Sequence, residues 1–291
     1  MDVHTYDLNI ADVQIRIRTD RELEEEPSFA PFLNRKKEPD YTADFRQVQQ
    51  LPPMPRQILY QSMCDRVHPD ESGVRIRSFF DEPRGIEYYA LGRYDDPGRN
   101  IQIDYLAEGA HCVSQMSNSF YHIGIEALMQ QEGKFFFHAA FLHSNWGGIL
   151  FSGPSGIGKS TQAALWCKHR GARLLNGDRP ILGKANGVWT AWGAPYAGSS
   201  RCYVDESRPI AGIIMLRQAP VCTIRRLSRR EAYRSIYAGL TVNSWNPAFS
   251  LSALDFAVAL AGEIPVYELC CTPDEAAVVC LEEQFRKDLI P

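Results

Sequence analysis

Residues 151–166, FSGPSGIGKSTQAALW, have the residue types and the spacing of a phosphate-binding loop. Read from Gly153, the segment is the Walker A pattern Gly-x-x-x-x-Gly-Lys-Ser. Its glycines allow a tight turn in which successive backbone N–H groups point inward and form an anion site at the start of a helix. We therefore expect ATP or another nucleoside triphosphate to bind here. The expected nucleotide-binding residues are Gly153, Ser155, Gly156, Ile157, Gly158, Lys159, Ser160 and Thr161.

Three side chains of this pattern have separate expected roles. Lys159 is placed to reach oxygens of the β- and γ-phosphates, and the Ser160 hydroxyl is a suitable ligand for Mg²⁺. Thr161 is placed to reach the α-phosphate. A glycine-rich turn without any ligand is the alternative interpretation. The predicted order of strand, loop and helix favours nucleotide binding.

The loop also needs an acid, because P-loop nucleotide-binding enzymes usually place an Asp after a buried strand to hold Mg²⁺. The apolar stretch AGIIML ends in Arg217, which cannot serve, and Asp104 lies within a predicted strand of the N-terminal part. Asp178 directly follows the short stretch RLLNG, nineteen residues after Lys159. Ser160 and Asp178 are therefore the expected metal ligands.

The segments around the loop alternate between strand and helix patterns. Residues 135–153 predict two apolar strands joined by a turn at 145–148, and residues 160–169 predict a helix closed by Gly171. Asn186-Gly187 predicts a type I′ hairpin turn. Further strands are expected at 172–178, 211–218, 222–228 and 265–270, and further helices at 117–133, 228–240, 248–262 and 272–285.

Capping residues mark two of these helices. Ser228 and Glu231 have the spacing of a capping box at the start of one helix. In the last helix, Thr272 is the expected cap, Pro273 takes the first helical position and Glu275 closes the box.

The N-terminal part has a different pattern, in which Ile and Val alternate with Arg or Gln. This pattern predicts a half-buried antiparallel sheet. Its expected strands are 13–19, 74–80, 86–92 and 101–106, and the expected flexible segments are 20–41 and 50–57. The sequence thus predicts a mixed α/β protein, with a smaller β-rich domain at 1–116 and a P-loop domain at 117–291.

Composition excludes several classes of partner. The net charge is −4, so no global basic field attracts nucleic acid or an anionic membrane. No apolar run approaches the roughly 20 residues of a membrane span. The eight cysteines are scattered and form no C-x-x-C pair, which favours reduced thiols in the cytoplasm over a disulfide framework or a zinc motif.

The stretch FHAAFLHSNWGGILFSGPSGIGKST, together with GARLLNGDRPIL, resembles the core of HPr kinase/phosphorylase and its relatives, which are related to phosphoenolpyruvate carboxykinase. The downstream segments WGAPYAGSSRCY, IIMLRQAPVCTIRRLSRREAY and IPVYELCCTPDEAAV are similar to HPr-kinase-like proteins of bacterial peptide-modification clusters, among them lasso-peptide kinases. The resemblance covers about residues 117–285. Members of that family often assemble, which implies a homo-oligomer.

The resemblance implies an ATP- and Mg²⁺-dependent kinase with a hydroxyl acceptor. In that family the acidic motif is normally Asp-Asp, whereas this chain has Gly177-Asp178. We expect Asp178 to receive or orient the proton of the acceptor hydroxyl, with His138 behind it, and Lys159 to hold the phosphates. Arg201 is the first choice for balancing charge on the transferred phosphoryl group, before Arg179 and the pair at 225–226. A core histidine is the alternative interpretation of His138.

The expected acceptor is a Ser or Thr hydroxyl of a peptide or protein, including a ribosomally made precursor peptide. This choice rests on family analogy. Two alternatives stay open. One is a nucleotide-binding regulatory or chaperone-like module with little transfer activity, which the absent second Asp favours. The other is a kinase of a small-molecule hydroxyl such as free serine.

Overall fold

The computed structural model describes residues 3–71, 74–95 and 99–289, and it divides into two compact units, Met1–Ile125 and Glu126–Pro291. Both units contain sheets and helices, so the mixed α/β class predicted from the sequence is confirmed. The domain boundary expected after residue 116 stays a prediction. Residues 1–2 and 290–291, at the outer ends of the two predicted domains, lie outside the described residues.

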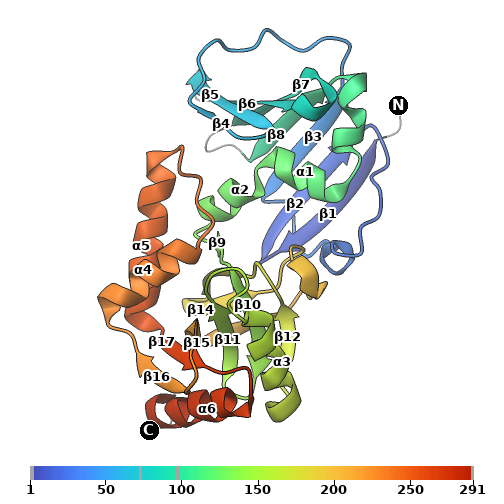
Figure 1. Ribbon diagram of the computed structural model, residues 1–291. Coiled ribbons are helices and arrows are strands. Elements are labelled where there is room, and N and C mark those ends of the chain that lie inside the picture. The colour runs from blue at the N-terminus through green and yellow to red at the C-terminus, as the bar shows by residue number, and fades with distance from the viewer. Residues whose placement is uncertain (1–2, 72–73, 96–98, 290–291) are drawn as a thin grey trace. The chain divides into compact units, whose positions relative to one another are not determined.

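The first unit is built on an eight-stranded sheet (Figure 1). Its strands, in spatial order, are β1 (His4–Ile10), β2 (Val13–Thr19), β3 (Tyr41–Gln47), β8 (Asn100–Tyr105), β7 (Ile86–Asp95), β6 (Val74–Asp81), β5 (Asp65–Glu71) and β4 (Tyr60–Gln61). The unit also contains the short 3-10 helices η1 (Ala30–Phe32), η2 (Glu82–Arg84) and η3 (Ala107–Val113) and the helix α1 (Met116–Ile123).

The alternating pattern of the N-terminal part forms the half-buried sheet that it predicts. In β2, Val13, Ile15 and Ile17 are buried, while Arg16 and Arg18 turn to the other face. The arginines pair with carboxylates of neighbouring strands, which satisfies their charge at the surface. The expectation of a purely antiparallel sheet is wrong, because β3 runs parallel to both β2 and β8. A long crossover through residues 20–40 makes this parallel pairing possible.

That crossover was expected to be flexible, and it contains no strand. It is nevertheless packed against the unit, since Leu23, Phe29 and Phe32 are buried. The Phe29 ring meets Phe120 edge to face, with ring centroids 4.9 Å apart. Three spaced apolar side chains therefore anchor a segment whose charged runs and prolines suggest a solvated loop.

The second unit is a nine-stranded sheet with helices on both faces (Figure 1). Seven strands follow the order β12 (Arg173–Asn176), β10 (Ala139–Ser144), β11 (Gly147–Ser152), β15 (Ser207–Gln218), β14 (Val188–Trp192), β13 (Ile181–Ala185) and β9 (Phe135–Phe136). β17 (Val266–Cys271) pairs with β15 and with β16 (Thr223–Arg226). The helices are α2 (Ile125–Gln131), α3 (Lys159–Arg170), α4 (Arg229–Gly239), α5 (Pro247–Glu263) and α6 (Glu275–Leu289).

Alternating side chains of the central strands supply two cores. On one face, Leu150 and Ile213 pack with side chains of α4 and α5. On the other face, Phe151 and Ile214 pack with side chains of α3 and α6. Because both faces are covered, these strands are apolar at almost every position, which is the usual pattern of a central strand in an α/β layer structure.

Several predicted element ends are confirmed by their capping geometry. α3 ends at Gly171, which has a left-handed φ of 63°. Asn186 and Gly187 both have positive φ, as a type I′ turn requires. The capping box of Ser228 and Glu231 is present at the start of α4.

Two predictions about helix ends are wrong. The single helix expected at 117–133 is divided by Gly124, whose φ of 68° ends α1 before α2 begins. Thr272 does not cap α6. The Asp274 side chain accepts a hydrogen bond from the Ala276 backbone at 3.0 Å, so Asp274 is the cap and the helix begins two residues later than the pattern suggested.

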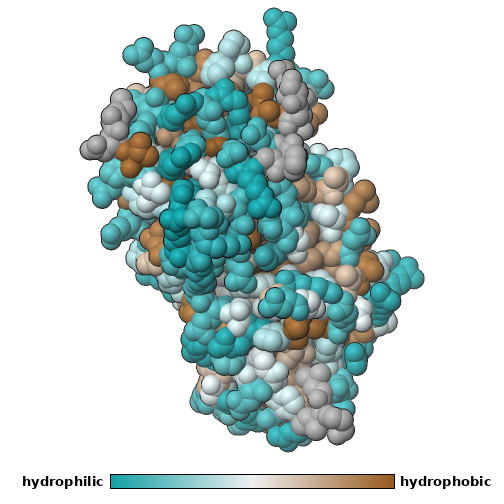
Figure 2. Space-filling view, turned by 180° about the vertical axis from the view of Figure 1, so that it is seen from behind, coloured by the Kyte–Doolittle hydropathy of each residue, from teal (hydrophilic) through white to brown (hydrophobic). Residues whose placement is uncertain are grey.

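Hydrophilic side chains predominate on the face of the molecule drawn in Figure 2, and hydrophobic ones form separate small patches there. Among the described residues, no helix has both the length and the apolar character needed to cross a membrane.

Candidate functional site

Strand direction brings three separate chain segments to one edge of the second sheet. β10 runs antiparallel to both β11 and β12. The carboxyl ends of β11 and β12 therefore lie beside the start of β10. His138 immediately precedes β10, the glycine loop (residues 153–160) follows β11, and Asp178 follows β12. The backbone confirms this meeting, because Ala139 N–H donates to the Asp178 carbonyl at 3.0 Å.

Asn176 shapes the turn that carries Asp178. Its side chain is fully buried, and its Oδ1 accepts hydrogen bonds from the backbone N–H groups of Asp178 (2.9 Å) and Arg179 (2.8 Å). Its Nδ2 donates to the carbonyls of Ala194 and Tyr196, both at 3.0 Å. One amide thus connects the Asp178 turn to the segment after β14. Sequence reasoning missed this residue, although the Asn-Gly pair before Asp178 is a signal for such a turn.

The space beside Asp178 is filled by the segment that contains η4 (Gly198–Ser200). A side chain at Gly177 would overlap the Ser200 side chain, and a Cβ at Gly198 would lie 3.0 Å from the Asp178 Cβ. The second carboxylate of the resembled Asp-Asp motif therefore has no room at position 177. Ser200 occupies the place that such a side chain would need.

The glycine loop has the backbone conformation that its composition predicts. Gly153, Gly156 and Gly158 have φ angles of 145°, 78° and 111°, a region that favours glycine. Gly158 is the N-cap of α3 and provides no side-chain cap. The first turn of α3 contains no acidic residue either. The positive end of this helix therefore faces the loop without a carboxylate of its own to neutralise it.

Lys159, His138 and Asp178 form a continuous chain of polar contacts. Lys159 Nζ donates to His138 Nε2 at 2.8 Å, and also to the carbonyls of Gly153 (3.1 Å) and Pro154 (3.2 Å). His138 Nδ1 lies 3.3 Å from Asp178 Oδ1. An ammonium group has only donors, so His138 Nε2 must accept and its Nδ1 carries the hydrogen that faces the carboxylate. His138 is thus a neutral ring between a cation and an anion.

The electrostatics of this chain agree with a neutral His138. Burial lowers the pKa of His138, and the nearby Lys159 ammonium lowers it further, against an opposing effect of Asp178. Burial likewise lowers the pKa of Lys159, and the Asp178 carboxylate counteracts this shift. Desolvation therefore disfavours the charged forms of both His138 and Lys159, and the Asp178 carboxylate favours both charged forms.

The expected metal ligands lie beside the same space. Ser160 is exposed at the first turn of α3, and Asp178 keeps 31% of its side chain exposed. Ser160 and Gly177, the neighbour of Asp178, line one cavity. A hydroxyl and a carboxylate are oxygen ligands of the kind that Mg²⁺ prefers, and the remaining positions of its octahedron are commonly filled by water and phosphate. These residues fit the group that the sequence implies.

Arg201 is not brought into the polar chain. It follows η4, has a left-handed φ of 50° and is exposed, and within the described residues its guanidinium forms no hydrogen bond or ion pair. Arg179 is closer, with its Nε 3.8 Å from Asp178 Oδ2. Asp104 lies in the first unit and pairs there with Arg46 and Arg93, in agreement with its exclusion from the site.

Two cavities flank the beginning of α3. The Gln218 cavity, about 560 Å³, is lined by residues of the glycine loop, by Thr161, Gln162, Gln218 and Ala219, and by residues 271–273. The Ser200 cavity, about 540 Å³, is lined by Ala140, Ser160, Ala163, Ala164, Cys167, Lys168, Leu174, Gly177 and Ser200. The first cavity borders the glycine loop, and the second borders the Asp178 turn.

The chain matches no known family model, and no curated protein matches it. Among solved structures, it is similar to the HPr(Ser) kinase/phosphatase from Coxiella burnetii. The identity is 15% and the TM-score is 0.32, over 53% of this chain and 90% of that chain.

Proposed function

We propose that this protein is an ATP-dependent kinase that transfers a phosphoryl group to a hydroxyl acceptor. The observation that carries the proposal is the contact chain from Lys159 through His138 to Asp178, located at the mouth of a Gly-x-x-x-x-Gly-Lys-Ser loop. The chain combines a cation for the phosphates with a carboxylate that is oriented by a neutral histidine. Phosphoryl transfer needs both, because it depends on positioning and charge neutralisation.

The loop amides at the start of α3 hold the polyphosphate, and Lys159 turns from the loop carbonyls and His138 to the β- and γ-phosphates. The Ser160 hydroxyl and the Asp178 carboxylate would hold Mg²⁺, which would supply neutralisation of the phosphate charge. Nucleotide binding thus replaces the three hydrogen bonds that Lys159 donates in the free protein. His138 Nε2 is released by this exchange.

Asp178 accepts the proton of the acceptor hydroxyl while the oxygen of that hydroxyl bonds to the γ-phosphorus. The bond between that phosphorus and the β,γ-bridging oxygen breaks, and ADP leaves with the electron pair. His138 holds the carboxylate through its Nδ1–H, and Arg201 or Arg179 balances the charge that develops on the phosphoryl oxygens.

The two cavities suggest where the two substrates lie. The Gln218 cavity has the volume of a small-molecule site and adjoins the glycine loop, so we assign it to the nucleoside. Gln162 fixes one wall, since its Nε2 donates to the Thr272 carbonyl at 3.2 Å. The Ser200 cavity adjoins the Asp178 turn and is lined mainly by small and apolar groups, so we assign it to the acceptor.

A Ser or Thr residue of a peptide or protein, including a ribosomally made precursor peptide, is the acceptor that we propose. An apolar neighbour of the acceptor hydroxyl would enter the Ser200 cavity. Location in the cytoplasm and assembly into a homo-oligomer belong to the same proposal. The eight free cysteines are compatible with a reducing compartment.

Purified full-length protein tests the proposal with ATP, Mg²⁺ and either peptides ending in Ser or Thr or free serine, followed by mass spectrometry. We expect a gain of one phosphoryl group that is lost in Asp178→Asn and kept in Asp255→Asn, which changes an exposed carboxylate on α5. Calorimetry of Lys159→Ala should show triphosphate affinity reduced about 10- to 100-fold, because charge-assisted hydrogen bonds are lost.

The alternative is a nucleotide-binding module with little transfer activity, and the absence of a side chain at Gly177 favours it. Tight ATP binding without transfer to any acceptor would support this module and reject the kinase. Transfer to free serine in preference to every peptide would reject the peptide acceptor alone. Unchanged ATP affinity in Lys159→Ala would reject the phosphate site itself.

A further inference from the structure

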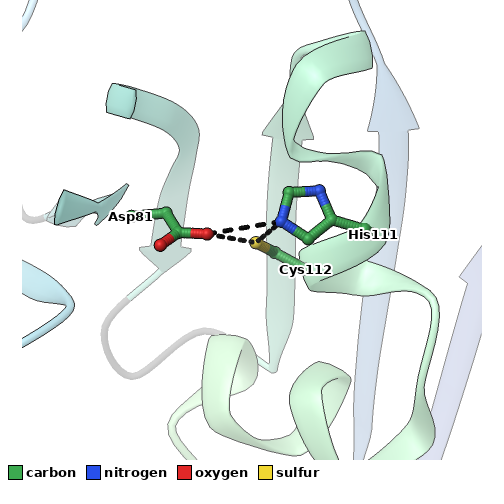
Figure 3. A group of neighbouring side chains, drawn as sticks. All are labelled: Asp81, His111 and Cys112. Atoms are coloured by element: carbon green, nitrogen blue, oxygen red, sulfur yellow. Dashed lines mark hydrogen bonds and ion pairs between the residues drawn. The ribbon is translucent and has the colours of Figure 1, made fainter. Parts of the chain in front are cut away.

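Three potential metal ligands converge in the first unit, far along the chain from the glycine loop. Asp81 is at the end of β6, and His111 and Cys112 are consecutive residues of η3; Figure 3 shows the three side chains pointing toward one another. His111 Nε2 lies 3.3 Å from Asp81 Oδ2 and 3.2 Å from Cys112 Sγ. Cys112 Sγ lies 3.9 Å from Asp81 Oδ2.

The fold places η3 against β7, the strand that pairs with β6 and so lies beside Asp81. Gly109, within η3, allows this close approach, because any side chain there would overlap Tyr89 of β7. Tyr89 is buried, and its hydroxyl lies 2.9 Å from His122 Nε2, which holds the Tyr89 ring in place. The backbone that carries His111 and Cys112 is therefore held close to β7 by packing at Gly109.

The three distances fit a tetrahedral metal ion. Zinc binds His nitrogen at about 2.0–2.1 Å, carboxylate oxygen at about 2.0–2.2 Å and Cys sulfur at about 2.3 Å, so tetrahedral ligand atoms lie about 3.4–3.6 Å apart. The observed separations of 3.2, 3.3 and 3.9 Å surround these values.

The mixture of donor atoms selects the class of metal. A thiolate sulfur and an imidazole nitrogen with one carboxylate oxygen suit Zn²⁺ and related late first-row ions, whereas Mg²⁺ and Ca²⁺ require oxygen ligands. We propose that Asp81, His111 and Cys112 form a Zn²⁺ site with three protein ligands and one open position. This site is separate from the proposed Mg²⁺ position at Ser160 and Asp178, and it does not rest on the proposed kinase function.

Arg84 determines how tightly the site binds. Its Nη1 donates to Asp81 Oδ2 at 2.7 Å, which is the same oxygen that faces His111. The guanidinium is 63% exposed, so it can move into water when a metal binds. It competes with the metal for one oxygen and repels its charge. Replacement of Arg84 is therefore expected to strengthen binding, in contrast to replacement of a ligand.

A bound ion would connect residue 81 to residues 111 and 112 and so hold η3 against the end of β6. Ligands that bind only the folded state stabilise it in proportion to their concentration and affinity. The site is therefore expected to make the melting temperature of the full-length protein depend on zinc. Because only three of the four tetrahedral positions are filled by protein ligands, the fourth is open to water or to a side chain of a partner.

The test uses full-length protein that has been treated with a chelator and a phosphine reductant, without nucleotide. Co²⁺ is the spectroscopic probe, and Zn²⁺ affinity is measured by competition with a colorimetric chelator. We expect one Co²⁺ per chain, with a thiolate charge-transfer band and the visible bands of tetrahedral cobalt. Cys112→Ser should abolish the charge-transfer band. His111→Asn and Asp81→Asn should each weaken zinc binding at least about tenfold.

Matched variants separate this site from nonspecific binding. Cys64→Ser changes an exposed cysteine of the same unit and should leave stoichiometry and affinity unchanged. Arg84→Gln should tighten zinc binding several-fold. Zinc should also protect Cys112, and not Cys64, from alkylation, as read by mass spectrometry. Circular dichroism checks that each variant is folded.

Stoichiometric binding that persists in Cys112→Ser, or cobalt spectra without a thiolate band, would overturn the proposal. Absence of binding to the reduced wild-type protein at micromolar metal would overturn it as well. Neither result would affect the kinase proposal, because all measurements are made without ATP and on residues of the first unit.

Discussion

Replacement of Asn176 tests how the turn that carries Asp178 is held. In Asn176→Ala the side-chain amide is lost, and with it two hydrogen bonds donated to backbone carbonyls and two accepted from backbone N–H groups. The residue is fully buried at the end of β12, so water does not readily replace the amide. Both the stability of the second unit and the position of Asp178 should therefore change.

The expected magnitude follows from these four contacts. A hydrogen bond of this kind contributes about 1 kcal/mol net, and a buried partner that is left unsatisfied costs about 1–3 kcal/mol. If water partly enters the space, the four losses should lower the free energy of unfolding by about 3–4 kcal/mol. That is a large share of the roughly 5–15 kcal/mol that stabilises a typical folded domain.

Urea denaturation of the full-length protein, followed by circular dichroism, measures this loss. Asn145→Ala is the control, because Asn145 is exposed in the turn between β10 and β11 and its replacement should cost less than about 0.5 kcal/mol. Asn176→Asp is a second test variant, measured at two pH values. It keeps the shape but directs a carboxylate oxygen at two carbonyls, so this variant should lose more stability at pH 8, where it is ionised, than at pH 5. A loss below about 1 kcal/mol in Asn176→Ala would refute the role assigned to this amide.

Three other predictions concern the same unit. Gly177→Ala should cost about 1–3 kcal/mol through overlap with Ser200, and Ser200→Gly added to it should recover much of the loss, as measured by urea midpoints; no recovery would place the strain elsewhere. NMR titration of the His138 ring should give a pKa below the ordinary value of 6.5. Lys159→Met should raise this pKa, because it removes a cation that disfavours the charged ring. An unchanged midpoint in Lys159→Met would contradict that contribution. Ser228→Ala should lower stability by about 1 kcal/mol through loss of the α4 cap while nucleotide binding is kept; equal urea midpoints would reject the cap.

The site could be predicted from the sequence where its chemistry lies in contiguous residues. The glycine loop is one local segment, and its backbone conformation follows from the positions of its glycines. Asp178 could be predicted as the acid of the site because a short predicted strand directly precedes it. The hairpin turn at 186–187 and the capping box at Ser228 were predictable for the same reason, since each depends on residues within four positions of one another.

Other features could not be predicted, because they depend on contacts between distant segments. The hydrogen bonds of Asn176 to Ala194 and Tyr196 join residues 18 and 20 positions apart, and the overlap between Gly177 and Ser200 joins residues 23 positions apart. The cluster of Asp81, His111 and Cys112 was invisible for the same reason. Its ligands are 30 residues apart, and the scattered cysteines had argued against a zinc site.

The sequence by itself thus determined the phosphate-binding pattern, the alternation of strands and helices in the second unit and the half-buried character of the first sheet. Periodicity and backbone preference act over a few residues, and they leave a direct mark on the order of amino acids. Only the tertiary structure decided that β3 runs parallel to its neighbours, that Ser200 fills the space beside Asp178 and that His138 connects Lys159 to Asp178. These arrangements depend on strand order and direction, which are fixed by packing of the whole unit and leave no local pattern in the chain.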